Sequence, residues 1–416
     1  RDGSVRFSEK SGRWGNFPGI LAGWRVSSED FWKNNVPFVD YFKLRASWGK
    51  MGNDEVNAFQ YLSSYSFGTG MIFGSDKTYY SGIYQSTTPN PFITWEVANV
   101  YNVGFESLLL KSKVKLDFEY FYQRRDNILI KRNASVPGYT GVSLPDENYG
   151  IVDNKGFEAV LGYADRIGDW TFMVNGNLAF ARNKVVEFDE PERNVPWQVQ
   201  TDHPMGCALL YKAAGIFKDE AHVESLPHVQ GARPGDIIIL DYSGDGTINS
   251  DDKILFDKTV DPEITYGISF SVGYKNWQLS GLVQGVGDCM RDMSLSLQGS
   301  EGNYFMYDAR GRWTPENTNA AKPRAWERDE EYWRSSYKTD FTYHNGAYAR
   351  MKNLQLSYTL PKKIQRTILL KDAELYVSGQ NLFLIYSGNK IMDPELGDSY
   401  NYPLMKVYSV GVNVVF

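Results

Sequence analysis

Six oxygen-bearing residues recur at regular intervals in one short acidic segment, Asp241-Tyr-Ser-Gly-Asp-Gly-Thr-Ile-Asn-Ser-Asp-Asp252. Counted from Asp241, oxygen donors stand at positions one, three, five, seven, nine and twelve, and Gly246 stands at position six, where a calcium loop turns sharply. Ca²⁺ takes about six to eight oxygen ligands in proteins. The spacing therefore predicts a calcium site whose ligands are Asp241, Ser243, Asp245, the Thr247 carbonyl oxygen, Asn249 and Asp252.

This loop departs from an EF-hand in two respects. Position twelve is Asp252 rather than Glu, and the flanking sequence shows no clear pair of helices, so the loop looks more like a dockerin-type loop. The alternative is an acidic Asp-Gly turn on the surface. We expect a structural role for Ca²⁺, in which an insertion near residues 233–257 stabilises the long segment from Glu187 to Asp261, because no candidate nucleophile lies nearby.

A second group of candidate binding residues is aromatic and lies between Gly287 and Gly346. Aromatic faces stack on sugar rings, and the Asp and Arg residues among them could bind hydroxyl or carboxylate groups. The candidate substrate-binding residues are Tyr304, Tyr307, Trp313, Trp326, Tyr332 and Trp333. For any one of these rings, packing of the segment against itself is the alternative interpretation.

Other reactive side chains form no recognisable pattern. The four histidines, His203, His222, His228 and His344, are scattered without a helical metal-binding spacing. Neighbouring carboxylates such as Glu327 and Asp329 could imitate a glycosidase pair, but sequence proximity does not define their separation across a bond. Cys207 and Cys289 permit one disulfide and prove none. We identify no catalytic residue and expect no enzymatic activity.

Composition limits the class of protein. The chain has 416 residues, a mean hydropathy of -0.43 and no apolar run of membrane-helix length, which excludes helical membrane spans. Its net charge of -6, with acidic and basic residues mixed along the chain, gives no basic stripe and no reason to expect nucleic acid. Aromatic residues make up 15% of the chain, and such residues concentrate at both membrane interfaces of a β-barrel.

Alternating side chains indicate the elements that hold these groups. In the segment from Val114 to Gln123, aliphatic and aromatic residues alternate with Lys115, Asp117 and Glu119. Successive side chains of a strand point to opposite faces, so one face suits lipid and the other suits a water-filled lumen. The last eleven residues alternate in the same way and end at Phe416.

Eleven such segments are predicted as membrane-spanning strands. They lie at 20–26, 42–48, 101–106, 114–123, 157–163, 170–180, 266–274, 277–283, 354–360, 375–379 and 406–416. Connections of a few residues, or the modest link Pro361 to Asp372, alternate with long segments, which are 53–99, 127–154, 187–261, 287–346 and 383–403.

The alternation of short and long connections predicts an all-β fold, a transmembrane antiparallel β-barrel. Outer-membrane barrels have short periplasmic turns and long extracellular loops, which orients the chain and places Phe416 at the periplasmic rim. Single-chain bacterial barrels have even strand numbers, and an unpaired edge cannot be satisfied by lipid. Eleven strands are therefore expected to be part of a larger barrel.

Several blocks of sequence resemble the SusC/RagA family of TonB-linked (TonB-dependent) outer-membrane proteins. The blocks are Arg1-Asp-Gly-Ser with Phe7, Arg13-Trp-Gly-Asn-Phe-Pro18 with Trp24-Arg25, Lys43-Leu-Arg-Ala-Ser-Trp-Gly49 with Gly52-Asn-Asp54, Trp95-Glu96 with Asn102-Val-Gly-Phe-Glu106, Lys352-Asn-Leu-Gln-Leu356, and Gly379-Gln-Asn-Leu382. They extend over nearly the whole chain and keep the family order.

The resemblance implies a 22-stranded barrel, of which residues 1–416 would be the carboxy-terminal half, without the plug domain and TonB box of the amino-terminal half. It also implies an outer-membrane nutrient importer of a Gram-negative bacterium, taking up oligosaccharides or peptides with TonB and a SusD-like surface lipoprotein at the extracellular mouth. Two alternatives remain: a surface binding or adhesion protein whose barrel is only an anchor, and a soluble calcium-stabilised β-protein acting on glycans.

Overall fold

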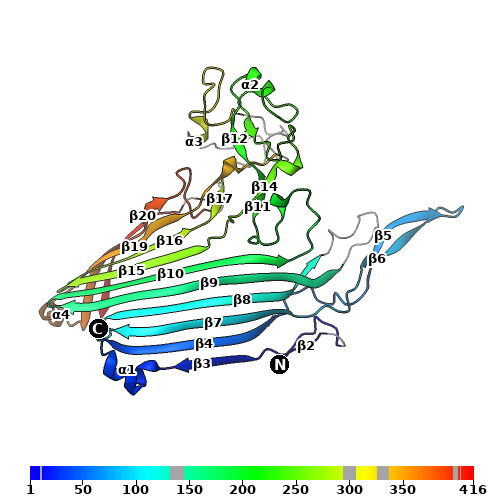
Figure 1. Cartoon of the computed structure of the whole chain (residues 1–416). Coiled ribbons are helices and arrows are strands. Elements are labelled where there is room, and N and C mark those ends of the chain that lie inside the picture. Colours follow the sequence, from blue (N-terminus) through cyan, green and yellow to red (C-terminus); the bar gives the residue numbers. More distant parts are fainter. Residues whose placement is uncertain (10–11, 132–144, 294–305, 326–336, 397–401, 403) are drawn as a thin grey trace.

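A single antiparallel sheet of eleven strands dominates the molecule (Figure 1). The computed structural model describes residues 1–9, 12–131, 145–293, 306–325, 337–396, 402 and 404–416. The strands of the sheet, in spatial order, are β3 (Gly19–Trp24), β4 (Val39–Asn53), β7 (Glu96–Leu109), β8 (Val114–Lys131), β9 (Asp146–Ile167), β10 (Trp170–Glu187), β15 (Ile264–Tyr274), β16 (Trp277–Gly287), β19 (Tyr348–Thr359), β20 (Asp372–Ser387) and β21 (Val407–Val415). Each predicted strand is present, and each pairs with its neighbours in the chain.

One face of the sheet, here called the outer face, is apolar. On it a row of phenylalanine rings crosses five strands with ring centroids 5.6–6.1 Å apart, in the order Phe42, Phe105, Phe118, Phe157 and Phe180. Cross-strand aromatic pairs stabilise antiparallel sheets. Large apolar side chains of this face remain exposed, such as Val103 at 61% and Val412 at 59%, as expected for a surface that contacts lipid.

Aromatic pairs mark one end of the outer face. Trp170 lies 4.5 Å from Tyr274, and Trp277 lies 4.7 Å from Tyr358, measured between ring centroids. All four residues are next to short turns, where their strands begin or end. This arrangement is typical of the aromatic girdle at a membrane interface.

Short and long connections alternate along the sheet. The short side has residues 110–113, 168–169 and 275–276, together with links that contain α1 (Asp30–Asn35) and α4 (Lys362–Thr367). The long connections leave the opposite end and are residues 54–95, 132–145, 188–263, 288–347 and 388–406. Lys371 donates its amide to the Val415 carbonyl, so Phe416 lies on the short side, as predicted.

Several strands extend beyond their predicted bounds, and β8 and β9 are the clearest case. Strands β8 and β9 continue beyond the segments predicted to span the membrane, and they pair from Ile128 with Gly150 to Lys131 with Asp146. The connection predicted at 127–154 is therefore shorter, because Ile128, Leu129 and Ile130 continue the pairing of β8 with β9 beyond the apolar part of the outer face. The sequence pattern weakens there because the outer face turns polar.

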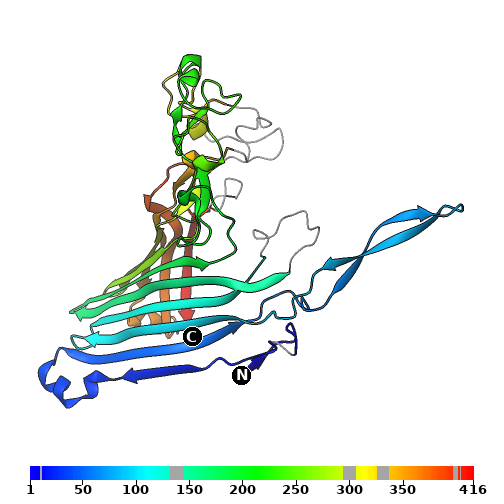
Figure 2. The same ribbon diagram turned by 45° about the vertical axis from the view of Figure 1, so that its right-hand side comes forward.

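The long loops contain secondary structure of their own. The loop after β4 forms a hairpin of β5 (Ser64–Phe73) and β6 (Thr78–Thr87), which projects away from the sheet (Figures 1 and 2). The remaining strands and α-helices of the described residues are β1 (Asp2–Gly3), β2 (Trp14–Gly15), β11 (Ala208–Tyr211), β12 (Ala213–Ile216), α2 (Glu220–Glu224), β13 (Ile237–Ile239), β14 (Lys253–Phe256), β17 (Met290–Asp292), α3 (Met306–Ala309) and β18 (Tyr343–Asn345). Among the described residues, no helix has the length and apolar character needed to cross a membrane.

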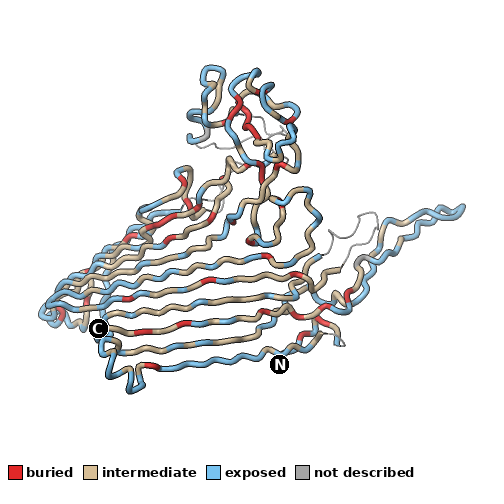
Figure 3. The backbone as a smooth tube through the Cα atoms, in the orientation of Figure 1, coloured by how far each residue is buried: buried red, intermediate tan, exposed pale blue. Residues whose placement is uncertain are grey.

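Most buried side chains belong to residues near the strand ends or in the loops, and only scattered residues along the middle of the sheet are buried (Figure 3). One small core at the long-loop end joins three of the sequence blocks that resemble the SusC/RagA family. Measured between ring centroids, Phe7 lies 5.5 Å and Phe17 lies 5.1 Å from Trp95. Arg6 donates to the carbonyl oxygens of Asp54 and Val56 beside it. These contacts give the amino-terminal motif residues a physical role, because they tie Arg6, Phe7 and Phe17 to the segments that follow β4 and precede β7.

Candidate functional site: extracellular loops and the inner wall

Two long loops fold together into one compact unit, here called the head, which comprises residues 208–256 and 306–325. In it β11 pairs with β14 and β12 pairs with β13. Its small core contains Phe217, Val223 and Ile238. Figures 1 and 2 show the head standing above the long-loop end of the sheet.

A buried ion pair joins the two loops of the head. Arg324 Nε lies 2.7 Å from Asp236 Oδ1, and the Asp236 side chain is only 1% exposed. The Arg324 amide donates to the Gly235 carbonyl, and the Trp313 indole donates to the Lys218 carbonyl at 3.1 Å. Burial raises the pKa of Asp236, since desolvation outweighs the Arg233 amide and the Arg324 guanidinium.

The predicted calcium loop connects β13 to β14 within the head. The Asp241 carboxylate accepts hydrogen bonds from the amides of Gly244 at 2.7 Å and Gly246 at 2.8 Å. Gly246 has a φ of +83°, so this turn requires glycine. Asp252 is fully buried and accepts from the Ser243 and Asn249 amides. A 3₁₀ turn at Ser250–Asp252, with Asn249 as its N-cap, closes the loop.

The donor set of this loop fits a hard cation such as Ca²⁺. Asp241, Ser243, Asp245, Asn249 and Asp252 bring side-chain oxygens, and Thr247 brings a carbonyl, into one twelve-residue loop. Within the described residues, however, no three His, Cys, Asp or Glu side chains are grouped as a ready metal cluster. The carboxylates are held by loop amides and hydroxyls instead.

These hydrogen bonds keep two carboxylates ionised. Hydrogen bonds from the Thr247 hydroxyl and amide lower the pKa of Asp245. At Asp241 desolvation acts to raise the pKa of the carboxyl, but hydrogen bonds from the amides of Gly246 and Gly244 outweigh it, and the pKa is lowered. The loop is therefore anionic at neutral pH, as a cation site requires.

Of the six aromatic residues predicted to contact substrate, two lie within the described residues. The Trp313 ring packs over Gly235, where an added Cβ would come within 2.6 Å of it. The Lys322 ammonium lies 3.5 Å from the centre of the Tyr307 ring. Both rings thus support the head. The other four aromatic candidates lie outside the described residues: Tyr304, Trp326, Tyr332 and Trp333. Glu327 and Asp329 lie outside them too.

The head contains a cavity of about 590 Å³. Its walls combine apolar residues of one loop, including Ile216, Leu226 and Ile238, with Thr318–Ala320 of the other. Lys218, His222 and Asp241 provide its polar groups. Because both loops contribute to the cavity, its shape depends on their joint fold.

Histidine and cysteine chemistry is not concentrated here. His203 lies 3.1 Å from Asp257, and His222 accepts from the Lys218 amide at 3.3 Å. Both cysteines are free thiols, and burial raises the pKa of Cys207 to about 11. Neither thiol has the lowered pKa of a reactive nucleophile.

The inner face of the sheet is polar and is divided into two parts. From β4 to β9 it presents charges, here called the charged arc: Lys43, Arg45, Glu106, Lys115, Asp117, Glu119 and Glu158. Arg45 bridges Glu106 at 3.1 Å and also contacts Glu119, and Lys115 lies 3.0 Å from Asp117. These charges compensate one another.

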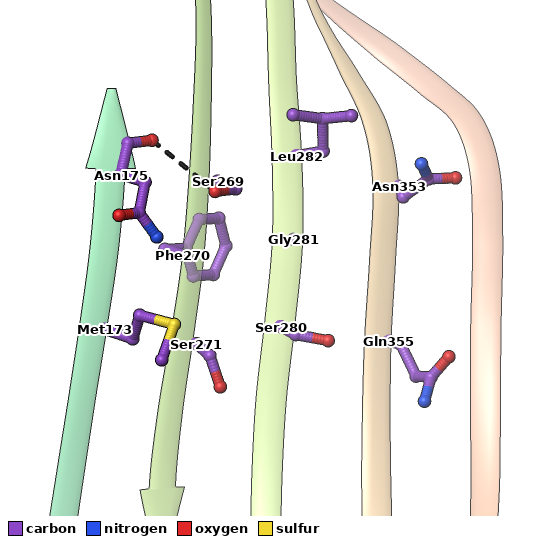
Figure 4. A pocket seen from close by; sticks show the side chains of 10 residues that line it. All are labelled: Met173, Asn175, Ser269, Phe270, Ser271, Ser280, Gly281, Leu282, Asn353 and Gln355. Atoms are coloured by element: carbon purple, nitrogen blue, oxygen red, sulfur yellow. Dashed lines mark hydrogen bonds between the residues drawn. The ribbon is translucent and has the colours of Figure 1, made fainter. Parts of the chain in front are cut away.

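From β10 to β21 the middle rows of the same face have no charged side chain, and this part is here called the neutral arc. A hollow of about 320 Å³ lies on it, lined by amide and hydroxyl side chains such as Asn175, Ser280, Asn353 and Gln355 together with the apolar Met173, Phe270 and Leu282 (Figure 4). Single-strand patterns did not reveal this part of the site. A comparison of charges among the polar positions of successive strands would have found it.

The β5–β6 hairpin is a further exposed surface that the sequence did not single out. Both of its faces present large apolar side chains to solvent, among them Phe67 at 79%, Met71 at 68% and Ile83 at 67% exposure. An isolated two-stranded hairpin is only marginally stable in water. Large exposed apolar surfaces of this kind mark sites of interaction.

An antiparallel sheet with an apolar outer face, a polar inner face and long loops at one end defines an outer-membrane β-barrel protein. The TonB dependent receptor-like β-barrel model matches residues 2–382. The chain belongs to this family, whose members are outer-membrane proteins of Gram-negative bacteria and act as receptors and transporters. The predicted fold class is thereby confirmed.

Two curated relatives are similar over the whole chain, and one of them is named SusC. The chain is 27% identical over 446 residues to TonB-dependent receptor P3 of Formosa agariphila, covering all of this chain and 43% of the relative. It is 24% identical over 438 residues to TonB-dependent receptor SusC of Bacteroides thetaiotaomicron, covering all of this chain and 41% of that protein. The chain thus spans less than half the length of these relatives.

Solved structures show the same fold. The RagAB peptide transporter matches with a TM-score of 0.75 at 19% identity, covering 99% of this chain and 44% of the other. The RagAB peptide importer in its open-open state matches with a TM-score of 0.76 at 18% identity, with the same coverage. At these identities the likeness concerns the fold alone.

Proposed function

We propose that this chain forms part of the wall of an outer-membrane importer that takes up oligosaccharides or peptides in a TonB-dependent step. The main support is the sheet itself, whose lipid-compatible outer face backs a continuous polar inner face. A barrel that serves only as an anchor also has a polar interior, so uptake of substrate separates the two functions. The family match agrees with this proposal, and so does the likeness in fold to the RagAB peptide importer.

Uptake by intact cells tests this function. A strain lacking the gene, and the same strain with the gene restored, are offered radiolabelled neutral oligosaccharides and radiolabelled peptides. We expect the restored strain to accumulate at least one of these pools, and a protonophore to abolish accumulation. Surface binding that is unchanged by the protonophore, with no accumulation, would instead favour the anchored binding protein.

We propose that the eleven strands pair with further strands to close a barrel. The sheet is open, since β3 and β21 form its two edges. Lipid cannot satisfy the backbone groups of an open edge, so only closed barrels span a membrane. The expected closing partner of β21 would be a strand outside residues 1–416.

The partner at the extracellular side is proposed to be a SusD-like surface lipoprotein. The β5–β6 hairpin supports this, because its exposed residues Phe67, Met71 and Ile83 need a covering protein. Replacing residues 64–87 with a short polar linker should abolish copurification of the lipoprotein while leaving the receptor at the cell surface. Copurification at the wild-type level would refute the assignment of this surface.

We further propose that the loop from Asp241 to Asp252 binds Ca²⁺. When bound, the ion would supply a positive charge that holds the loop oxygens together and stabilises the head. Its position between β13 and β14, next to the head cavity, supports a structural role rather than a catalytic one.

A further inference from the structure

The register of the sheet places uncharged side chains in continuous rows across the neutral arc. One row runs from Asn175 through Ser269, Leu282, Asn353 and Gln380 to Val407. The next row toward the short turns contains Met173, Ser271, Ser280, Gln355, Ser378 and Ser409, and the following row contains Thr171, Gly273, Gln278, Ser357, Tyr376 and Gly411. None of these positions is Asp, Glu, Lys, Arg or His.

Charged groups border this arc at its two ends. At the long-loop end Lys352, which stands beside Asn353 at a register shift of β19, is paired with Glu395. At the long-loop end, Arg350 is 4% exposed and lies 2.5 Å from Asp393 and 2.6 Å from Glu395, so its charge is compensated by the loop after β20. At the short-turn end, Glu374 lies opposite Asn413. Between these ends a molecule in the lumen would meet amides, hydroxyls and a few apolar side chains such as Met173 and Leu282, but no charged group.

Several of these amides and hydroxyls are available to a ligand. Gln278 donates to the Ser271 hydroxyl at 3.0 Å, but Asn175, Asn353 and Gln355 make no side-chain hydrogen bond within the part of the chain that the structure describes. Figure 4 shows these amides and Ser280 around the hollow of about 320 Å³. They offer both donors and acceptors without a fixed charge.

We infer that the neutral arc is a track for uncharged oligosaccharides, in contact with the substrate as it passes through the lumen. This inference rests on the proposed import function and specifies its substrate class. Sugar hydroxyls both donate and accept, as do Ser, Asn and Gln side chains. Passage requires binding that is weak and spread over many sites, which repeated neutral groups provide and a charged cluster does not. Charged peptide termini would find no counter-ion here.

Opposite charges introduced at one position test the inference in the whole receptor. The variants are Asn353→Lys and Asn353→Asp, with Asn353→Ser as the neutral control. Matched changes at Asn102, which lies on the inner face of the charged arc and donates to Ser47 at 3.3 Å, give Asn102→Lys and Asn102→Asp. Uptake of neutral and of uronate-containing radiolabelled oligosaccharides is measured and normalised to the amount of receptor at the surface.

We expect the ratio of anionic to neutral uptake to rise about tenfold in Asn353→Lys and to fall in Asn353→Asp, because the substrate passes the new charge at close range. Asn353→Ser and both Asn102 variants should leave the ratio unchanged. If Asn353→Lys does not reach the surface, Ser378→Lys on the next strand replaces it.

Three results would overturn the inference. The first is an equal change of the ratio in the Asn353 and Asn102 variants, and the second is no change in either. The third is uptake of peptides without uptake of neutral oligosaccharides by the wild type, which leaves the proposed importer intact but refutes this substrate class. If the wild type takes up neither peptides nor oligosaccharides, that result contradicts the proposed function itself.

Discussion

At the scale of single residues, carboxylates in the head have different tasks because their surroundings differ. Asp236 is buried against Arg324, whereas Asp241 and Asp245 lie in a loop rich in amide and hydroxyl donors. Burial raises the first pKa and hydrogen bonding lowers the other two. One carboxylate therefore holds two loops together, and the other two remain ionised for a cation.

The calcium proposal predicts a local effect on stability. In the double variant Asp241→Ala and Asp245→Ala, the head should be cleaved faster by protease in the presence of Ca²⁺, because two of the proposed ligands are lost. The wild type should become equally sensitive when a chelator is added. Limited proteolysis followed by mass spectrometry checks this.

Asp251→Ala is the matched control for that experiment. Asp251 lies in the same loop, but its carboxylate accepts from Asn194 at 3.3 Å and is not among the proposed ligands. Its protease sensitivity should still respond to the chelator. Protection of the wild type that is independent of Ca²⁺ would contradict the calcium site.

The lowered pKa values of Asp241 and Asp245 predict a pH dependence. A carboxyl whose pKa is lower in the folded state contributes stability above its unfolded value, and this contribution is lost as the pH falls through the folded value. Without Ca²⁺, the loop should therefore stay ordered through the ordinary Asp range near pH 3.8 and open below it. Hydrogen exchange of peptides covering residues 241–252 measures this, and opening well above that pH would contradict the hydrogen-bond assignment.

At the scale of elements, the head depends on contacts between loops that are far apart in sequence. Asp236 and Arg324 are separated by 88 residues. Breaking a buried ion pair by removing one partner costs about 3–5 kcal/mol, because the remaining charge is buried alone. The fold of the head is thus expected to be sensitive to this one pair.

Arg324→Ala should destabilise the head more than Asp236→Asn does. The first change leaves a carboxylate that is 1% exposed without its guanidinium, while the second leaves Arg324, which is 14% exposed and can reach water. Hydrogen exchange at β13 should rise strongly in the first variant and less in the second. The opposite order would show that desolvation of Asp236 is not the dominant cost.

The two faces of β21 should respond differently to charge. Val412→Lys places an ammonium on the lipid face near the middle of the strand, which costs about 2–4 kcal/mol in a membrane barrel. Asn413→Lys places it on the inner face of the same strand, next to Glu374, where the cost is small. The amount of each receptor that reaches the outer membrane measures the difference, and equal amounts would contradict the assignment of faces.

The strands were predictable because alternation is a local property. Charges at Lys115, Asp117 and Glu119 between aromatic neighbours identify β8 and its two faces from one short segment. The Asp236–Arg324 pair, the head cavity and the rows of the neutral arc could not be predicted, since they join residues from different loops and strands. The exposed rings of the β5–β6 hairpin were missed for another reason: apolar residues on both faces of a strand give no amphipathic pattern.

At the scale of the whole molecule, the structure separates three tasks in space. The outer face contacts lipid, the long-loop end holds the head and the β5–β6 hairpin, and the inner face offers charged and neutral arcs to the lumen (Figures 1 and 2). This division follows from alternation along each strand and from the alternation of short and long connections. It assigns the long-loop end and the short turns to opposite sides of the membrane.

Labelling of introduced cysteines in intact cells tests this orientation most directly. In a background with Cys207→Ser and Cys289→Ser, one variant has Ser75→Cys at the tip of the β5–β6 hairpin, and another has Asp169→Cys in the β9–β10 turn. A membrane-impermeant maleimide should label the first in intact cells and the second only after the outer membrane is broken. Equal labelling of both in intact cells, or labelling of Asp169→Cys alone, would contradict the barrel and its orientation.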